Sequence, residues 1–183
     1  MSDEEYFKDR MMIEDKHYFM TSQWIYFFNP KRVLDIGCGA GHFVKSFHDC
    51  NIIVRGFDKS KWVIKNTPHV SVEDFLKQGD ITEGVPFDKS FDLVLAIDIL
   101  EHLSCESDLD KALINLSKAS SKHVLISVPV IGDPNLEADP THLIKESREW
   151  WIKKFENIKG FVLIDTPEWF YYYEQLFILK VKE

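Results

Sequence analysis

The stretch that most constrains this chain is a short apolar run with an acid near its end, followed by three glycines at alternate positions. It spans residues 33–41 and reads Val-Leu-Asp-Ile-Gly-Cys-Gly-Ala-Gly. The short, branched run predicts a buried strand, and residues 42–49 have apolar side chains at helical spacing. Glycine has no Cβ, so the turn between them lets backbone N–H groups approach a ligand closely. Strand, turn and helix together form the first half of a nucleotide-binding βαβ unit.

The glycine spacing differs from the dinucleotide-binding fingerprint, G-x-G-x-x-G, in which a pyrophosphate lies at the helix N-terminus. Here the pattern is Asp-x-Gly-x-Gly-x-Gly, with Asp35 ahead of the glycines. A carboxylate at the tip of the strand disfavours a phosphate and suits a cationic or hydroxyl-bearing ligand. The turn by itself also fits a structural role, so the order of the later segments decides its meaning.

Bulk properties predict one ordinary globular domain over residues 1–183. No apolar run approaches the roughly 20 residues needed to span a bilayer, which predicts no membrane insertion. The acidic start, Met-Ser-Asp-Glu-Glu, lacks the features of a signal peptide, so we expect a cytoplasmic protein. The net charge of −8 makes nucleic acid an unfavourable partner. Three cysteines without CxxC spacing argue against a disulfide framework or a zinc cluster.

Further strands are predicted along the chain, and acids follow two of them. Segments 52–57 and 75–78 are interpreted as the second and third strands, closed by Asp58 and by Gly79-Asp80. An acid about 20 residues beyond the glycine turn is the expected partner of a ribose diol, because its two oxygens can accept both hydroxyl protons. Capping the helix that follows is the competing role of Asp58. The later predicted strands are 91–97, 123–128, 161–164 and 176–181, with helices over 108–119 and 146–155.

These segments resemble, in order, the motifs of the class I S-adenosylmethionine-dependent methyltransferases. The resemblance is strong over residues 31–130 and weak over the remainder. It rests on the stretch 33–41 and on Gly56-Phe57-Asp58-Lys59-Ser60, Gln78-Gly79-Asp80-Ile81, Val85-Pro86-Phe87, Phe91-Asp92-Leu93-Val94 and Leu100-Glu101-His102-Leu103. It implies an α/β fold: a Rossmann-like, seven-stranded, mostly parallel sheet with helices on both faces and an antiparallel last strand.

The resemblance also implies S-adenosylmethionine as the cofactor and S-adenosylhomocysteine as its product. The carboxylate that matches Asp35 lies near the methionine amino group in this family, and the acid that matches Asp80 accepts a hydrogen bond from adenine. Two structural roles stay open, because Gly41 also suits close helix–strand packing and Gly79-Asp80 also suits a turn. The residues implied to bind the cofactor are Asp35, Gly37, Cys38, Gly39, Gly41, Asp58, Lys59, Asp80, Ile81 and Asp98.

An acid–histidine set follows the predicted fourth strand. Asp98, Glu101 and His102 lie at i, i+3 and i+4, so they share a face if the segment is helical. Ligands of open parallel sheets bind beyond the carboxyl ends of the strands, so this segment is expected to face the donor methyl group. His142 follows another strand end and can join the set. The candidate catalytic residues are therefore Glu101, His102 and His142.

Three interpretations of this set stay open. The first is a helix cap or substrate-positioning role without metal. The second is a general base, since an imidazole pKa near ~6.5 suits removal of a hydroxyl proton. The third is a divalent metal that lowers the pKa of the acceptor hydroxyl. Similar sets occur in small-RNA 2′-O-methyltransferases and, in part, in ubiquinone-pathway O-methyltransferases, where the first acid is usually Glu. Asp98 is one methylene shorter, which makes a metal the least favoured of the three.

Three segments outside these motifs bear on acceptor binding. Residues 1–29 look helical and aromatic, which predicts either helices packed on the sheet edge or a lid over the pocket. The loop 129–140 is rich in proline, glycine and acids, which suits substrate contact. The aromatic run 169–173 is interpreted as core in preference to an acceptor pocket.

Together these features predict an S-adenosylmethionine-dependent methyltransferase that acts on a small-molecule acceptor. Oxygen is the first choice of acceptor atom, because histidines and acids lie next to the expected methyl position. The alternatives are a non-catalytic S-adenosylmethionine-binding regulatory or partner subunit, and a metal-assisted RNA 2′-O-methyltransferase, which the acidic balance disfavours. The sequence does not identify the acceptor or the oligomeric state.

Overall fold

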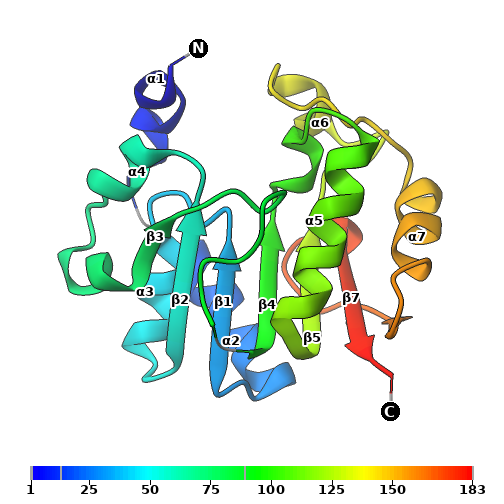
Figure 1. Cartoon of the computed structure of the whole chain (residues 1–183), viewed down its shortest axis with the longest axis horizontal. Coiled ribbons are helices and arrows are strands. Elements are labelled where there is room, and N and C mark those ends of the chain that lie inside the picture. Colours follow the sequence, from blue (N-terminus) through cyan, green and yellow to red (C-terminus); the bar gives the residue numbers. More distant parts are fainter. Residues whose placement is uncertain (1, 13, 89, 183) are drawn as a thin grey trace.

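A seven-stranded sheet forms the centre of the molecule, with the strand order β3-β2-β1-β4-β5-β7-β6 (Figure 1). The structure is a computed structural model that describes residues 2–12, 14–88 and 90–182. The strands are β1 (Arg32–Ile36), β2 (Ile53–Asp58), β3 (Leu76–Gln78), β4 (Phe91–Ile97), β5 (Ser120–Ser127), β6 (Phe161–Ile164) and β7 (Leu176–Val181).

The pairing of the strands confirms the predicted mixed sheet. The first five strands pair in parallel, whereas β7 is antiparallel to both β5 and β6. From β1 the chain moves outward through β2 to β3 and then returns to β4 on the other side of β1. This reversal of direction between β1 and β4 creates a crevice at the carboxyl ends of the strands, where ligands of open α/β sheets bind.

Helices cover both faces of the sheet, and each face has its own apolar core. On one face α2 (Asp15–Phe28) and α3 (His42–Asp49) pack against the strands, and on the other α5 (Glu106–Ala119) and α7 (Arg148–Glu156) do so. Successive strand residues alternate between the two cores: Val33 joins the α2/α3 side and Leu34 the α5/α7 side, and both are fully buried. Continuous apolar runs in the central strands follow from this two-sided burial.

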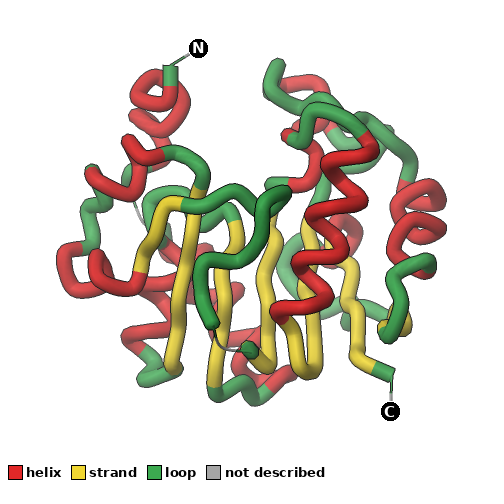
Figure 2. The backbone as a smooth tube through the Cα atoms, viewed as in Figure 1, coloured by secondary structure: helices red, strands yellow, loops and turns green. Residues whose placement is uncertain are grey.

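Short helical elements gather at the carboxyl ends of the strands (Figure 2). Their placement puts these irregular segments where a ligand would enter. These elements are α1 (Asp3–Phe7), η1 (Lys8–Arg10), α4 (Lys61–Lys65), η3 (Leu100–His102) and α6 (Pro134–Ala138). Two further 3₁₀ turns, η2 (Val70–Phe75) and η4 (Tyr173–Gln175), precede β3 and β7.

Local chemistry explains where the main elements begin and end. Helix α2 ends at Asn29, which adopts the left-handed conformation and donates its N–H to the Ile25 carbonyl before Pro30. Ser60 caps α4 by accepting the Val63 N–H. Helix α6 lies in the segment 129–140 that the sequence predicts as loop. It is one short turn, opened by Asp133 as cap and Pro134 at its first position, and it lacks a long apolar periodicity.

The predicted absence of a membrane span agrees with the helices that are seen. In residues 2–12, 14–88 and 90–182, no helix combines the length and apolar character needed to cross a bilayer. Met1 and Ile13, which belong to the predicted N-terminal helical segment, lie outside the described residues.

Replacing Trp24 by alanine is expected to lower the free energy of unfolding by about 3–5 kcal/mol. The indole is fully buried and packs against Phe43 and Phe47 of α3, so its removal leaves a cavity between helix and sheet. Urea denaturation measures the change. The matched control is Tyr26→Ala in the same helix, where the side chain is 81% exposed and the expected loss is below about 1 kcal/mol. Equal losses in the two variants would contradict the placement of Trp24.

Candidate active site

A cavity of about 720 Å³ opens at the carboxyl ends of β1, β4 and β5. Its walls come from the N-terminal segment, the glycine turn after β1, the segment after β4, the chain between β5 and α7, and the turn before β7. Of the residues predicted from the sequence, it brings together Asp35, Gly37, Cys38, Gly39, Asp98, Glu101, His102 and His142. The lining therefore joins the methionine side of the predicted cofactor site to the acid–histidine set.

The glycine turn is closed onto β2 and packed against the segment that follows β4. The N–H groups of Gly37 and Cys38 both donate to the Phe57 carbonyl, at 2.9 and 3.1 Å. A Cβ on Gly37 would lie 2.1 Å from Cγ2 of Ile99, and its φ of 69° adds a second reason for glycine. Gly39, with φ of 50°, has Phe7 of α1 as its nearest such neighbour, at 3.5 Å. The Cys38 side chain is buried, and burial raises the pKa of its thiol well above the usual value.

Asp35 is a buried acid, and one of its carboxyl oxygens is free to bind a ligand. The residue is 2% exposed, and its Oδ2 has no hydrogen-bond partner among the described residues. Burial, with a smaller contribution from Asp58, raises the pKa of Asp35 to about 8. A buried carboxylate without a partner is costly, so the site favours a ligand that brings positive charge. The ammonium and sulfonium groups of S-adenosylmethionine fit this requirement.

Asp58 supports the glycine turn from the end of β2. Its Oδ2 accepts the Gly39 N–H at 3.0 Å, and its Oδ1 accepts the Ser60 N–H at 2.8 Å. The capping role considered for Asp58 is performed by Ser60. Burial raises the pKa of Asp58, while the two backbone N–H groups oppose that shift. Asp58 lies behind the turn and outside the lining of the cavity.

Four other predicted cofactor residues also lie outside the lining. A Cβ on Gly41 would come within 3.1 Å of Leu76, so this glycine serves the close helix–strand packing considered from the sequence. Asp80 accepts two hydrogen bonds from Thr82, as in a turn. Ile81 is buried in the α5/α7 core, and Lys59 is exposed. The cavity thus covers only part of the predicted cofactor site.

The segment after β4 turns sharply at Asp98, whose φ is 52°. Its N–H donates to the Ser127 carbonyl at 3.1 Å, and its carboxylate accepts the Ser127 hydroxyl, so β5 holds the turn in place. Ser127 was not singled out from the sequence; a hydroxyl at the end of a parallel strand beside β4 is the signal that could have found it. Asp98 lines the cavity and is exposed to it, and desolvation by the protein around its carboxyl group raises its pKa.

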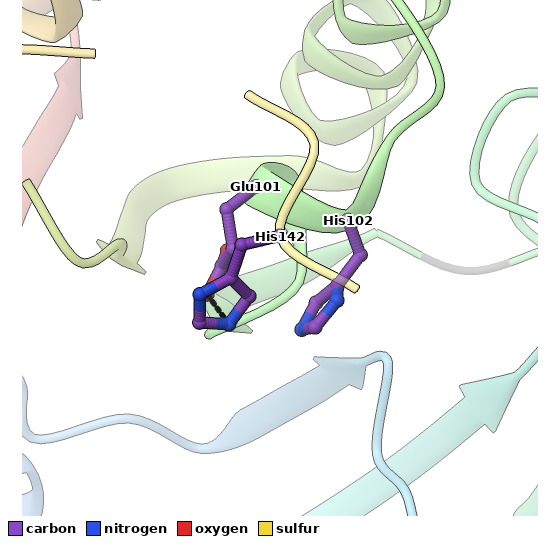
Figure 3. A group of neighbouring side chains, drawn as sticks. All are labelled: Glu101, His102 and His142. Atoms are coloured by element: carbon purple, nitrogen blue, oxygen red, sulfur yellow. Dashed lines mark ion pairs between the residues drawn. The ribbon is translucent and has the colours of Figure 1, made fainter. Parts of the chain in front are cut away.

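A backbone bridge brings His142 to Glu101. The carbonyl oxygen of Glu101 accepts the N–H groups of Leu143 and Ile144, at 2.7 and 2.9 Å. Figure 3 shows the result: Glu101 and His102 project from η3, and His142 reaches them from the loop that follows α6. The ring centres of the two histidines are 4.7 Å apart, and Nε2 of His142 is 3.9 Å from Oε1 of Glu101.

Hydrogen bonds assign the same tautomer to both histidines. Nδ1 of His142 lies 3.0 Å from the Leu136 carbonyl, and Nδ1 of His102 lies 3.2 Å from the Thr141 carbonyl. A carbonyl only accepts, so each Nδ1 carries the proton and each neutral ring keeps its lone pair on Nε2. Burial, followed by the charge of His142, lowers the pKa of His102, which keeps its imidazole neutral near pH 7.

Glu101 is the least satisfied acid of the site. Its side chain is 0% exposed, and in the described part of the chain neither carboxyl oxygen has a hydrogen-bond partner. Burial and the nearby charge of Asp98 raise its pKa well above the usual value. One potential ligand atom from each of Glu101, His102 and His142 lies within 4.8 Å of the others. Two imidazoles and a carboxylate suit a divalent transition metal, so the residues present fit such an ion.

The N-terminal segment covers the cavity, and its role was left open by the sequence. Tyr6 contacts His102 edge-on, with ring centres 6.1 Å apart. Arg10 forms an ion pair with Asp139 at 3.2 Å across the opening. Helix α2 packs on the sheet through Met20 and Trp24 and also lines the cavity at Lys16, His17 and Met20.

One residue of the aromatic run 169–173 belongs to the core. Phe170 is 3% exposed, but Trp169, Tyr171, Tyr172 and Tyr173 are all exposed, and Tyr172 lines the cavity. The interpretation of the run as core was therefore wrong for the other four residues. Their exposure follows from a turn that departs from the sheet before β7, which composition does not reveal.

Comparisons with known proteins agree with the fold. The model of a methyltransferase domain family matches residues 6–171. The ubiquinone biosynthesis O-methyltransferase of Glaesserella parasuis serovar 5 (strain SH0165) is 32% identical over 101 residues, which cover 48% of this chain and 41% of that protein. The small RNA 2′-O-methyltransferase of Xenopus tropicalis is 26% identical over 118 residues, which cover 56% of this chain and 31% of that protein.

Solved structures extend the likeness to nearly the whole chain. The crystal structure of an S-adenosylmethionine-dependent methyltransferase from Archaeoglobus fulgidus superposes with a TM-score of 0.68 and 23% identity, covering 97% of both chains. The chain spans less than half the length of the two relatives named above. Because the family model covers most of its length, the chain belongs to the methyltransferase domain family, that is, to the class I S-adenosylmethionine-dependent methyltransferases of Rossmann-like fold.

Proposed function

We propose that this methyltransferase transfers the methyl group of S-adenosylmethionine to a hydroxyl oxygen of a small-molecule acceptor. The observation that supports this most directly is the pair of histidines. Both rings have Nδ1–H bonded to a backbone carbonyl, which leaves two Nε2 lone pairs beside the cavity. A lone pair fixed in this way can take the proton that a hydroxyl must lose when it is methylated.

On the donor side, Asp35 and the glycine turn would hold the methionine part of the cofactor. The open oxygen of Asp35 accepts the ammonium group, and the turn at Gly37 and Gly39 lies under the ligand. Asp58 and Asp80 would bind ribose and adenine, and Gly41, Lys59 and the backbone of Ile81 would lie beside them. Phe7 lies against Gly39, and Asp3 accepts a hydrogen bond from Ser60 beside Asp58, so α1 covers the entrance to this half.

The reaction is an in-line displacement in which the acceptor oxygen forms a bond to the methyl carbon. The carbon–sulfur bond breaks, its electron pair stays on sulfur, and the sulfonium becomes a neutral thioether. The hydroxyl proton passes to Nε2 of His142 or His102, and the carboxyl group of Glu101 stabilises the imidazolium that forms. Because the sulfonium is already activated, the protein mainly positions the two reactants.

The lining of the cavity favours a small acceptor over a polynucleotide. Apart from histidines, its acidic and basic side chains are six acids and two bases, a balance that disfavours a phosphate backbone. The acids are Asp9, Glu14, Asp35, Asp98, Glu101 and Asp139, and the bases are Arg10 and Lys16. The likeness to a small RNA 2′-O-methyltransferase keeps RNA as an alternative acceptor, and a regulatory subunit that binds the cofactor without turnover is a further one.

A divalent cation is a second candidate at the same centre, favoured by the unpartnered oxygens of Glu101. Glu101, His102 and His142 would hold it through one carboxyl oxygen and two Nε2 atoms. Its positive charge would lower the pKa of the acceptor hydroxyl. The bonds from Nδ1 to Leu136 and Thr141 would orient the two imidazoles toward it. The shorter Asp98, bonded to Ser127, stays outside this group of three.

The affinity for S-adenosylmethionine is expected to rise with pH up to about 8. The pKa of Asp35 is raised to about 8, so the carboxyl is mostly protonated at pH 7 and must lose its proton to bind a cation. Affinity should therefore change about tenfold per pH unit below that pKa, and the rise should end at about pH 8, where the ammonium group of the ligand begins to lose its own proton. Calorimetric titration between about pH 6 and pH 8 measures this. The Asp35→Asn variant should bind weakly and without this pH dependence; a wild-type slope in that variant would contradict the assignment.

His102→Ala and His142→Ala are each expected to lower turnover by roughly 10²-fold or more while sparing the affinity for S-adenosylmethionine. Both changes remove a lone pair from the acceptor side and leave Asp35 and the glycine turn in place. A methyl-transfer assay over a set of hydroxylated acceptors gives the turnover. The control is His48→Ala, on α3 against Phe75, which should leave turnover unchanged. Full turnover in both active-site variants would remove the histidines from the chemistry.

A metal titration distinguishes the mechanism with a bound cation from the mechanism in which a histidine alone acts as base. If the centre holds a cation, Mn²⁺ should bind one site in the wild type and lose at least about tenfold in affinity in Glu101→Gln, as when a metal loses a carboxylate ligand. Turnover should then fall on chelation and return with Mn²⁺. Turnover that is indifferent to the chelator assigns proton removal to the histidines alone.

A further inference from the structure

Tyr172 has a backbone conformation that tyrosine rarely adopts. Its φ is 59° and its ψ is 31°, in the left-handed region. The other described non-glycine residues with positive φ are Asn29, Asn51 and Asp98, whose short polar side chains tolerate this region. For a bulky side chain the same geometry is strained, and strain of this kind persists only where the surroundings impose it.

The turn that contains Tyr172 is held on both sides. Before it, the Gln23 side chain of α2 donates to the Trp169 carbonyl at 2.5 Å and accepts the Tyr171 N–H at 2.9 Å. After it, the Gln175 N–H donates to the Tyr172 carbonyl at 2.9 Å, and the Gln175 side chain donates to Asp133. With Phe170 buried as well, the backbone at Tyr172 is fixed from both directions.

The strained backbone places an aromatic ring in the wall of the cavity. Tyr172 lines the cavity together with the apolar side chains of Met20 and Leu176. Its ring centre is 4.2 Å from that of Tyr171, and the two residues are 47% and 37% exposed. A hydrogen bond with Tyr171, then burial, raises the pKa of Tyr172 to about 12, so its phenol stays neutral. The wall therefore offers an uncharged aromatic surface.

We infer that Tyr172 determines acceptor specificity and that the acceptor presents a planar, uncharged, hydroxylated aromatic ring to it. This inference rests on the proposed function, because the ring's hydroxyl group must reach His102 and His142. Aromatic rings favour offset or edge-to-face contact with one another beyond the area they bury. The six acids of the lining disfavour an anionic acceptor such as a phenolate or a carboxylate-bearing ring, and the uncharged aromatic wall suits a neutral ring.

The test compares two probes with the same pair of neighbouring hydroxyls, catechol and cis-cyclohexane-1,2-diol, of which only catechol is planar and aromatic. Their binding to the full chain saturated with S-adenosylhomocysteine is measured by calorimetry. The wild type and Tyr172→Phe should prefer catechol by about fivefold or more, because both keep the ring. Tyr172→Ala and Tyr172→Gly should lose that preference, while all four proteins keep the same affinity for S-adenosylhomocysteine.

The two ring-deleted variants also measure the strain. Both lack the tyrosine ring, but only glycine is relaxed at positive φ, so Tyr172→Gly should have the higher Tm. Equal Tm values, or Tyr172→Ala the more stable, would show that the backbone is not strained and would overturn the inference. A wild type that binds the two probes equally, or ring-deleted variants that keep the preference for catechol, would overturn it as well.

The failure of this inference and the failure of the proposed function give different results. If catechol is methylated equally well by the wild type and by Tyr172→Gly, the inference fails while the proposed function stands. If the ring preference follows Tyr172 but no methyl is transferred to either hydroxyl probe, the specificity role stands and O-methylation fails.

Discussion

The site depends on the burial of two carboxyl groups at one end of the sheet. Asp35 and Glu101 are almost completely buried, each has an oxygen without a hydrogen-bond partner in the described residues, and burial raises both pKa values. An ionised carboxylate in such surroundings has a high free-energy cost, so each group stays neutral until a positively charged group binds beside it. The apolar strands around them create this condition. The same packing that stabilises the sheet therefore prepares one position for a cationic donor and another for proton or cation chemistry.

The backbone joins these two positions to distant parts of the chain. The Glu101 carbonyl binds two consecutive N–H groups after His142, so the segment beyond α6 is attached to η3 by main-chain bonds. On the donor side, the Phe57 carbonyl closes the glycine turn and Asp58 supports it from behind. Backbone hydrogen bonds are insensitive to side-chain identity. The positions of the reacting groups can therefore persist while the surrounding loops change.

Much of the fold could be predicted because it rests on local pattern. The apolar run at 91–97 and the acid-then-glycine order at 33–41 indicate parallel strands, and parallel strands bring their carboxyl ends to one edge. Asp35, Asp98, Glu101 and both histidines meet at that edge for this reason. Other features depend on contacts between distant residues. The exposure of Tyr172 follows from a clamp by Gln23, 149 positions earlier in the chain. Likewise, the packing of Gly41 on Leu76 becomes visible only once β3 is placed.

The contact between Gly37 and Ile99 has a consequence for how such enzymes diversify. The space where a Cβ would stand on Gly37 is filled by the Ile99 side chain, two residues before Glu101. The glycine turn after β1 and the segment after β4, which carries the acid–histidine set, are therefore packed directly against each other. A substitution that enlarges a side chain at this contact would move both segments. Cavity-lining segments outside this contact include the chain between β5 and α7 and the turn before β7. A substitution in these outer segments can therefore alter the acceptor side of the cavity without moving the contact between Gly37 and Ile99.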